Sequence, residues 1–355
     1  MTSLTSFDPN AASSADSGIF GLPYSEKESA LVFLPVPWEA TTSYGAGTSK
    51  GPAAILEASR QVDLFDIDVE KPYEAGMFLL PESRQVRTWN RKAKAEAAKV
   101  IRAGGVIGKN AKLRSALKTV NALSGMLNDY VFAETKRLLK SGKFVGVLGG
   151  DHSVPFGAIR AVAEKHPSFG ILHLDAHSDT RRAFEGFAWS HASIMHNVLE
   201  NIPQVKKLVQ VGIRDFCEEE YDYTRAQGER VQVFYDRDLA RKKFEGANWW
   251  DVSRDLIVSA LPQEVWISFD IDGLDPKFCP HTGTPVPGGL DYQEALHLLW
   301  TVVHSGRKII GFDLNEVSPD PSNSEDEWDA NVGARLLYKL GALMLASQGK
   351  ATLRR

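Results

Sequence analysis

The chain has 355 residues, and 43% of them are hydrophobic, so it can bury one large core or two cores of ordinary size. Its formal net charge of -4 gives no indication of a nucleic-acid partner or a membrane-surface partner. The first residues lack the basic start and apolar centre of a signal peptide, and no stretch of about 18 apolar residues could span a membrane. The chain has only two cysteines, Cys217 and Cys279, so we expect a cytoplasmic protein.

Residues 1–20 are rich in Ser, Ala, Thr and Asp, and we expect a flexible N-terminal arm there, followed by a single domain over 21–355. Eight apolar runs in that domain predict strands. They lie at 30–36, 75–81, 144–148, 169–174, 207–213, 231–235, 265–269 and 308–314. Most of them are continuously apolar rather than alternating, which is typical of parallel strands that are covered on both faces.

Helical patterns separate these runs. Gly51-Pro52 opens the first one, because a proline in the first turn of a helix loses no hydrogen bond. The longest helical stretch, 91–141, is rich in Lys, Arg and Ala, and breaks near Gly104-Gly105 and Gly108 predict two or three surface helices. Strands that alternate with helices predict an α/β fold with a mostly parallel sheet of about eight strands.

Three clusters of acid and histidine each follow directly after an apolar run. They are Gly-Gly-Asp-His-Ser at 149–153, Asp-Ala-His-Ser-Asp at 175–179 and Ser-Phe-Asp-Ile-Asp at 268–272. One such cluster alone would have an ordinary explanation as a turn, a cap or a structural hydrogen-bond group. The carboxyl ends of parallel strands lie at one edge of a sheet, however, so three clusters at strand ends predict one shared site.

The clusters have the composition of a two-metal site. Alternate residues of an extended segment point the same way, so the side chains of each cluster can converge. The candidate ligands are His152, Asp175, His177, Asp179, Asp270 and Asp272. Four gathered carboxylates repel one another unless cations lie between them. Nitrogen and oxygen ligands without cysteine suit Mn, Fe, Zn, Ni or Co, and the excess of carboxylates favours Mn²⁺. Paired ions of this kind support hydrolysis at an electrophilic carbon or phosphorus.

In this order, the clusters resemble the three signatures of the ureohydrolase family, which includes arginase, agmatinase and formimidoylglutamase. The resemblance extends over residues 30–345 and includes Thr-Thr-Ser-Tyr at 41–44, Gly-Pro-Ala-Ala-Ile at 51–55, Gly-Thr-Pro at 283–285 and Asp-Leu-Asn-Glu-Val-Ser-Pro at 313–319. It implies a three-layer α/β/α fold with an eight-stranded, mainly parallel sheet. It also implies two Mn²⁺ ions, with Ni²⁺ or another divalent transition metal as the alternative, a homotrimer or homohexamer, and hydrolysis of a guanidino group with release of urea.

The resemblance also implies a role for each site residue. One ion would be bound by His152, Asp175, Asp179 and Asp270, and the other by Asp175, His177, Asp270 and Asp272. Three residues would be catalytic. Asp179 would pass a proton to the leaving amine, Glu316 would hold the guanidinium, and His191 would line the site and shuttle protons or orient the substrate.

Agmatine, hydrolysed to putrescine and urea, is the expected substrate. Cys217 stands where arginases have a carboxylate for the amino-acid head, and Val-Gly-Ile-Arg at 211–214 resembles agmatinases and guanidino-acid hydrolases. Arg181 and Arg182 follow Asp179, and they would favour a carboxylate tail over an amine tail if they face the pocket. The rings of Phe184, Phe187 and Trp189 could narrow the pocket.

Several alternatives stay open. The substrate could be 4-guanidinobutyrate, 3-guanidinopropionate, guanidine, arginine or a formimino compound. A catalytically silent, metal-binding regulator is an alternative from another class, although an intact ligand set argues against it. A two-metal phosphoesterase is a third, but the strand ends carry no basic or glycine-rich phosphate cluster.

Overall fold

The computed structural model describes residues 7–42, 44–323 and 325–354. Its central sheet has eight strands in the order β3-β1-β4-β9-β8-β5-β6-β7, and every neighbouring pair is parallel. The strands are β1 (Leu31–Val36), β3 (Met77–Leu79), β4 (Phe144–Gly149), β5 (Phe169–Leu174), β6 (Val205–Ile213), β7 (Val231–Tyr235), β8 (Glu264–Asp270) and β9 (Lys308–Asn315). Each corresponds to one predicted strand, so the expected α/β fold with an eight-stranded parallel sheet is confirmed.

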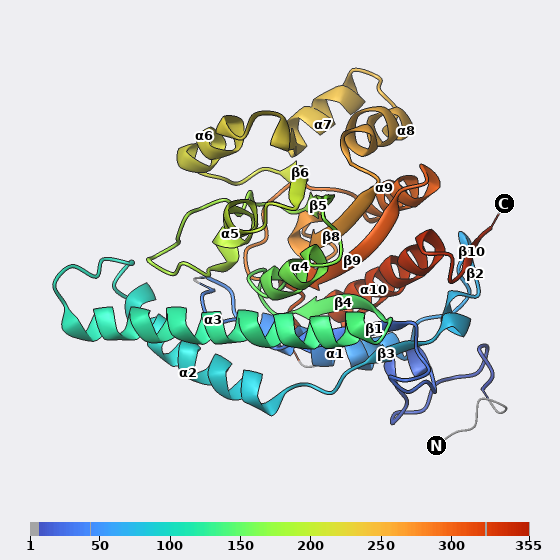
Figure 1. Cartoon of the computed structure of the whole chain (residues 1–355), viewed down its shortest axis with the longest axis horizontal. Helices are drawn as coiled ribbons and strands as arrows, with labels where there is room; N and C mark the ends of the chain where they lie inside the picture. Colours follow the sequence, from blue (N-terminus) through green and yellow to red (C-terminus); the bar gives the residue numbers. More distant parts are fainter. Residues whose placement is uncertain (1–6, 43, 324, 355) are drawn as a thin grey trace.

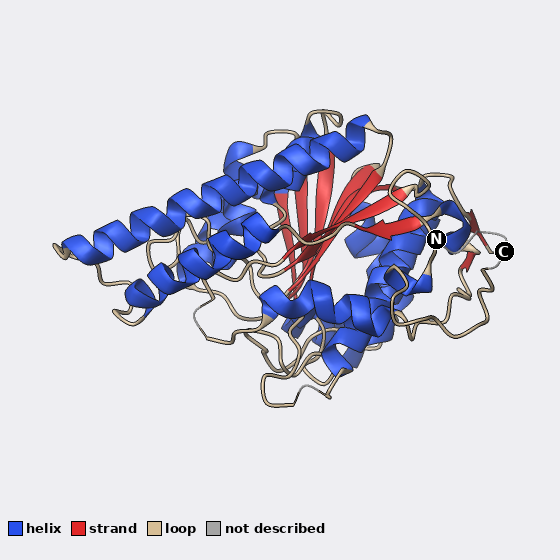
Figure 2. Ribbon diagram, turned by 90° about the horizontal axis from the view of Figure 1, so that it is seen from below, coloured by secondary structure: helices blue, strands red, loops and turns tan. Residues whose placement is uncertain are grey.

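Helices cover both faces of the sheet, which gives the three layers visible in Figure 2. The core on one face is shared with α1 (Gly51–Ser59), α9 (Tyr292–His304) and α10 (Trp328–Ser347). The core on the other face is shared with α2 (Arg84–Ile101), α3 (Ala111–Lys140), α4 (Phe156–Ala163) and α5 (Ile194–Asn201). The helices α6 (Glu218–Ala226), α7 (Asp236–Phe244) and α8 (Trp249–Asp251) lie together at the top of Figure 1.

The predicted helical stretch at 91–141 forms α2 and α3, separated by a segment with Gly104, Gly105 and Gly108 at positive φ. The first helix starts earlier than predicted, because the Ser83 side chain accepts the backbone N–H of Val86 and caps it. The second helix does not lie only on the surface. It packs against α4 and β4, and its far end extends beyond the sheet (Figure 1).

The chain ends add two features that the sequence patterns did not predict. Ile19 and Phe20, the last residues of the expected arm, are buried in the core, and the backbone N–H of Phe20 donates to Ser59 Oγ at 3.0 Å. Two-residue strands β2 (Val69–Glu70) and β10 (Thr352–Leu353) form a small antiparallel sheet. Residues 1–6 of the expected arm and Ser43 of the 41–44 motif lie outside the described residues. Within the described part of the chain, no helix is both long and apolar enough to cross a bilayer.

The three clusters lie at the carboxyl ends of β4, β5 and β8, and Glu316 of the 313–319 motif directly follows β9. These four strands are neighbours in the middle of the sheet, in the order β4-β9-β8-β5. The fold therefore brings all of the predicted site residues to one edge of the sheet.

Candidate metal centre and active site

Two glycines place the first ligand. A Cβ atom on Gly149 would overlap Asn315 Oδ1, and a Cβ atom on Gly150 would overlap the backbone of Trp38. Neither glycine has a positive φ angle, so they are needed for the close approach of backbones rather than for an unusual turn. The tight packing carries the chain from β4 over the sheet and leaves His152 buried at the site.

His152 lies at the centre of the first ligand group. Its Nδ1 atom is 3.0 Å from Asp175 Oδ2, 3.2 Å from Asp179 Oδ2 and 3.2 Å from Asp270 Oδ2. These are the four residues predicted to bind one ion, and at most 5% of any of these side chains is exposed.

His177 lies at the centre of the second ligand group. Its Nδ1 atom is 3.4 Å from Asp175 Oδ1 and 3.2 Å from Asp272 Oδ2. The two oxygens of Asp175 therefore face different histidines, as a carboxylate shared between two ions would. The structure thus brings together all six ligand candidates.

Hydrogen bonds fix which nitrogen of His152 is available to a metal. His152 Nε2 lies 2.9 Å from Ser268 Oγ, and Ser268 Oγ donates to Asp313 Oδ1 at 2.9 Å. Trp266 and Asn315 also donate to Asp313, so this carboxylate is held as an acceptor. Because the Ser268 proton is directed to Asp313, Ser268 must accept from His152 Nε2–H. When this imidazole is neutral, the lone pair therefore lies on Nδ1, which faces the three carboxylates, and a cation can take the place of the Nδ1 proton.

Two acids of this site, Asp179 and Asp270, are costly to ionise without a cation. Burial, reinforced by the charge of Asp175, raises the pKa of Asp179 to about 6. Burial and the charges of Asp272 and Asp175 raise the pKa of Asp270 well above its ordinary value. Divalent ions would remove this penalty, and the nitrogen and oxygen donor set without cysteine suits them. The residues present therefore fit two metal ions.

Two of the predicted catalytic residues have unusual backbones. Among the described residues, five other than glycine have a positive φ, and they include Asp179 at 55° and Glu316 at 62°. Such conformations cost energy, and a packed site has to hold them. For Glu316, the backbone N–H of His152 provides this support by donating to Oε1 at 2.9 Å.

The second oxygen of Glu316 indicates which kind of group the site can bind. Oε2 is buried and has no hydrogen-bond partner within the described residues. Burial, and then the charges of Asp270 and Asp151, raise the pKa of Glu316 well above its ordinary value. A buried carboxylate without a partner is unfavourable, so this oxygen is suited to a cationic group such as a guanidinium.

A small cavity of about 170 Å³ opens beside the ligand groups. Its wall includes His177, Asp179 and His191. Burial and the neighbouring charges of His177 and His152 lower the pKa of His191 to about 4, so its imidazole is neutral at pH 7. The loop position predicted for His191 therefore does face the pocket, where its Nδ1 lies 3.4 Å from Thr41 Oγ1.

The two neighbouring arginines Arg181 and Arg182 differ in their position relative to the outer wall of this cavity. Arg181 lines the cavity, with its Nε 3.4 Å from Glu220 Oε2, whereas Arg182 is exposed and is not part of the wall. The guanidinium of Arg181 lies over the Phe184 ring, 5.1 Å from its centre. Asp215 completes the charged part of the wall. Sequence reasoning gave no role to Asp215 or Glu220, since neither belongs to the three clusters.

Other residues considered for the pocket lie elsewhere. Phe187 is fully buried against α2 and α3, and Trp189 packs on Phe156, so only Phe184 of the three rings lines the cavity.

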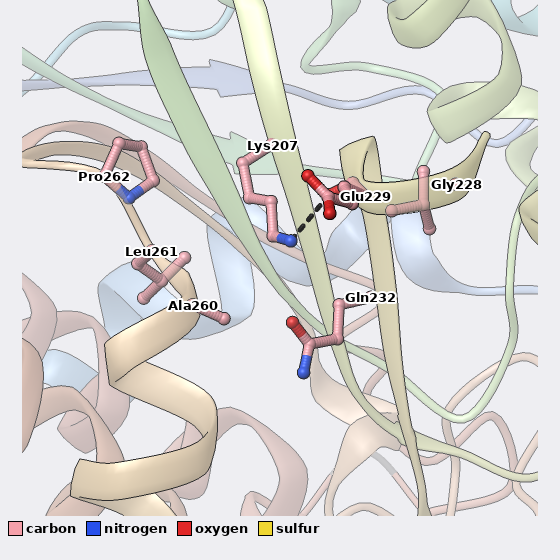
Figure 3. Close-up of a pocket in the computed structure, with 8 residues that line it drawn as sticks. Lys207, Gly228, Glu229, Gln232, Ala260, Leu261 and Pro262 are labelled. Carbon is pink, nitrogen blue, oxygen red and sulfur yellow. Dashed lines mark hydrogen bonds between the residues drawn. The ribbon is translucent and has the colours of Figure 1, made fainter.

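A larger, open hollow of about 730 Å³ lies at the amino ends of β6 and β7, at the opposite edge of the sheet. Figure 3 shows that hollow, where Lys207 donates to the backbone oxygen of Glu229 at 2.6 Å. It holds no group of acids and histidines.

Comparison with known proteins decides the family. The family model described as "Arginase family" matches residues 29–342 of this chain. This chain belongs to the arginase family. The N(1)-aminopropylagmatine ureohydrolase of Synechocystis sp. is 30% identical over 331 residues, which cover 91% of this chain and 92% of that protein. The proclavaminate amidinohydrolase of Streptomyces clavuligerus is 32% identical over 314 residues, which cover 87% of each chain. A solved structure of proclavaminate amidino hydrolase from the same organism matches with a TM-score of 0.71 and 26% identity, and covers 95% of this chain and 100% of its own.

Membership of the arginase family confirms the ureohydrolase resemblance and the expected class of enzyme, a hydrolase of guanidino C–N bonds. Proteins of this family use a binuclear divalent metal centre, which agrees with the two ligand groups that meet at Asp175. They act on small guanidino substrates and are commonly oligomeric.

Proposed function

We propose that this arginase-family protein hydrolyses the terminal guanidino C–N bond of a small substrate and releases urea and an amine, with agmatine as the first candidate. The observation that carries the proposal is the position of Glu316. Its unpartnered, buried Oε2 provides an anionic contact for a guanidinium beside the two ligand groups of His152 and His177.

We further propose that the two ions are Mn²⁺. One would be held by His152, Asp175, Asp179 and Asp270, and the other by Asp175, His177, Asp270 and Asp272. When bound, the ions would supply Lewis acidity and a water of lowered pKa. The remaining chemistry falls to the side chains around them.

Glu316 orients the substrate. Its carboxylate pairs with two N–H groups of the planar guanidinium, which fixes the central carbon in front of the attacking water. Asp179 belongs to the first ligand group and also lines the cavity, so it is placed to accept a proton from that water and to deliver it to the leaving nitrogen. His191 is neutral at pH 7, so it can accept a hydrogen bond from the substrate or relay a proton along the pocket wall.

The tail of the substrate lies toward Asp215, Glu220 and Arg181 in this proposal. Agmatine is supported by the acids Asp215 and Glu220, and by the similarity to a relative named for an agmatine derivative. A guanidino acid is the second candidate, and one observation favours it. Arg181 lines the pocket, and a guanidinium fork is suited to bind a carboxylate tail.

We also propose a homotrimer or homohexamer, and a cytoplasmic location. Support comes from the oligomers common in this family and from the two cysteines, both of which are free thiols.

The test is urea release by the purified protein, loaded separately with Mn²⁺ and Ni²⁺. The substrates are agmatine, arginine, 4-guanidinobutyrate, 3-guanidinopropionate and guanidine, and formamide release from a formimino compound is measured in parallel. A preference for agmatine with Mn²⁺ supports the full proposal. A preference for a guanidino acid keeps the reaction and moves the substrate to the second candidate. No urea from any substrate, with two ions bound per chain, overturns the proposed reaction in favour of a formimino substrate or a silent regulator.

A further inference from the structure

A row of polar side chains crosses the middle of the otherwise apolar sheet, below the proposed ligands. Gln210 on β6, His173 on β5, Ser268 on β8 and Asp313 on β9 are partners in register across four neighbouring strands. All four side chains are fully buried. Ser268 and Asp313 support His152, as described above, but the other half of the row, Gln210 and His173, leads to Asp175.

The hydrogen bonds of Gln210 determine where the proton of His173 lies. Gln210 Nε2 is 2.7 Å from the backbone oxygen of Ser178, which can only accept, so the amide group has one orientation. The second hydrogen of the same NH₂ group is directed to His173 Nδ1 at 2.9 Å. Since Nδ1 accepts, the imidazole carries its proton on Nε2, and Nε2 donates to Asp175 Oδ2 at 2.8 Å.

Asp175 is consequently held at both of its oxygens. Oδ2 accepts from His173, and Oδ1 accepts from the backbone N–H of His177 at 2.6 Å. Oδ2 also faces His152, whereas Oδ1 also faces the imidazole of His177. Because each oxygen of Asp175 accepts one of these hydrogen bonds, the carboxylate has a fixed rotation between the two ligand groups.

We propose that His173 is a positioning residue for Asp175 and that Gln210 sets its proton position; this inference rests on the proposed binuclear centre. One side-chain nitrogen of His173 lies close to His152, Asp175 and Asp179, since one donor atom from each of these four residues lies within 4.8 Å of the others. A nitrogen that carries a proton has no lone pair for a metal, however, so His173 acts through Asp175 and is not itself a ligand.

The proposal predicts an unequal effect on the two ions. Loss of the His173 donor releases Oδ2, on the side of His152, while the backbone N–H of His177 still holds Oδ1. The ion beside His152 should therefore weaken by about 10- to 100-fold, which is typical for the loss of an outer hydrogen bond to a metal ligand. The ion beside His177 should change much less.

The experiment measures Mn²⁺ binding without substrate, by calorimetric titration of the metal-free protein and by the electron paramagnetic resonance signal of coupled and single ions. His173→Gln keeps an N–H donor, and His173→Phe keeps a ring of similar size without one. We expect His173→Gln to bind two ions nearly as the wild type does, and His173→Phe to bind one ion tightly and one weakly, with loss of the coupled signal. If Gln loses as much affinity as Phe, or if Phe binds as well as Gln, the proposal is overturned.

A second variant keeps the test valid if His173→Phe does not fold. Gln210→Met has a similar volume and removes the donor that fixes the His173 proton, and Gln210 makes its side-chain hydrogen bonds to His173 and Ser178 rather than to a proposed ligand. It should weaken the same ion by a smaller factor, and unchanged binding of both ions would contradict the role given to Gln210. Gln232→Met, on β7 beside the hollow of Figure 3, is the matched control and should change neither ion. Because no substrate is used, failure here is distinct from the absence of urea release in the wild type, which would overturn the proposed reaction instead.

Discussion

The inner and outer walls of the candidate active site are built in different ways. The inner wall consists of side chains at the ends of four neighbouring strands, and hydrogen bonds from neighbouring strands hold ligands such as His152 and Asp175 in place. The outer wall consists of loop residues such as Arg181, Asp215 and Thr284, which are partly exposed. Rigid strands are suited to hold ions and reacting atoms, whereas loops can change with the substrate tail. The inner wall should therefore determine the reaction, and the outer wall should determine which substrate enters.

The largest expected effect is on the inner wall. Asp270→Asn removes one of the two charged carboxylates proposed to be shared between the ions, and it should lower kcat/KM by about 10³-fold or more because the developing charge loses its stabilisation. Urea release together with the metal content per chain checks this prediction. A variant that kept two ions and near-normal activity would contradict the shared role of Asp270.

Glu316→Gln should have the next largest effect. The amide is nearly the same size, but it cannot provide a charged pair for a guanidinium, so we expect kcat/KM to fall by about 10²- to 10³-fold while both ions stay bound. Steady-state kinetics and metal analysis of the same preparation separate these effects. If the variant loses an ion, Glu316 belongs to the metal centre, and the division between ion binding and substrate binding is wrong.

The outer wall is tested by reversing one charge. Arg181→Glu should shift the preference between agmatine and 4-guanidinobutyrate toward agmatine by about 10- to 100-fold, which corresponds to one charge-assisted hydrogen bond. Arg182→Glu makes the same change of charge on the exposed neighbour and is the matched control. Equal shifts in the two variants would indicate a general effect of charge rather than a contact in the pocket. If the wild type and the Arg181 variant had the same preference between agmatine and 4-guanidinobutyrate, Arg181 would not contact the substrate tail.

The difference between the walls also explains how much of the molecule could be predicted from its sequence. The strands were predictable because a strand buried on both faces requires a continuous apolar run, and the ligands were predictable because His152 and the two Asp-containing clusters follow such runs directly. The pocket wall was not predictable from spacing, since Glu220 lies at the start of α6 and reaches the cavity only through the fold.

The polar row inside the sheet was missed for a different physical reason. A single polar residue within an apolar strand, such as Gln210 or His173, has no distinctive spacing in the sequence. Its role depends on the register between strands, which places Gln210 opposite His173 and Ser268 opposite Asp313. Sequence patterns within one strand contain no information about that register, although an uncompensated polar residue in a buried strand is itself a sign that a partner must exist.

The stability of the metal-free protein should also depend on pH, and this dependence tests whether the inner wall is built for ions. Burial raises the folded-state pKa of Asp179 from about 4 to about 6, and the pKa of Asp270 and Glu316 well above the ordinary range. At a pH between the unfolded-state pKa and the higher folded-state pKa of these acids, the native protein binds more protons than the unfolded chain does. Its free energy of unfolding therefore falls as the pH rises through this range. Asp179 alone accounts for up to about 3 kcal/mol between pH 4 and pH 7.

Bound ions keep these carboxylates charged, and the penalty is then absent. The gain in melting temperature on adding Mn²⁺ to the metal-free protein should therefore increase from pH 5 to pH 8, and Asp179→Asn should reduce that increase because it removes one titrating group. Calorimetric scans with a chelator and with Mn²⁺ measure it directly. A gain that does not change with pH would mean that the buried acids are neutralised by protein groups instead, and the inner wall would then be a hydrogen-bonded cluster rather than a site organised around cations.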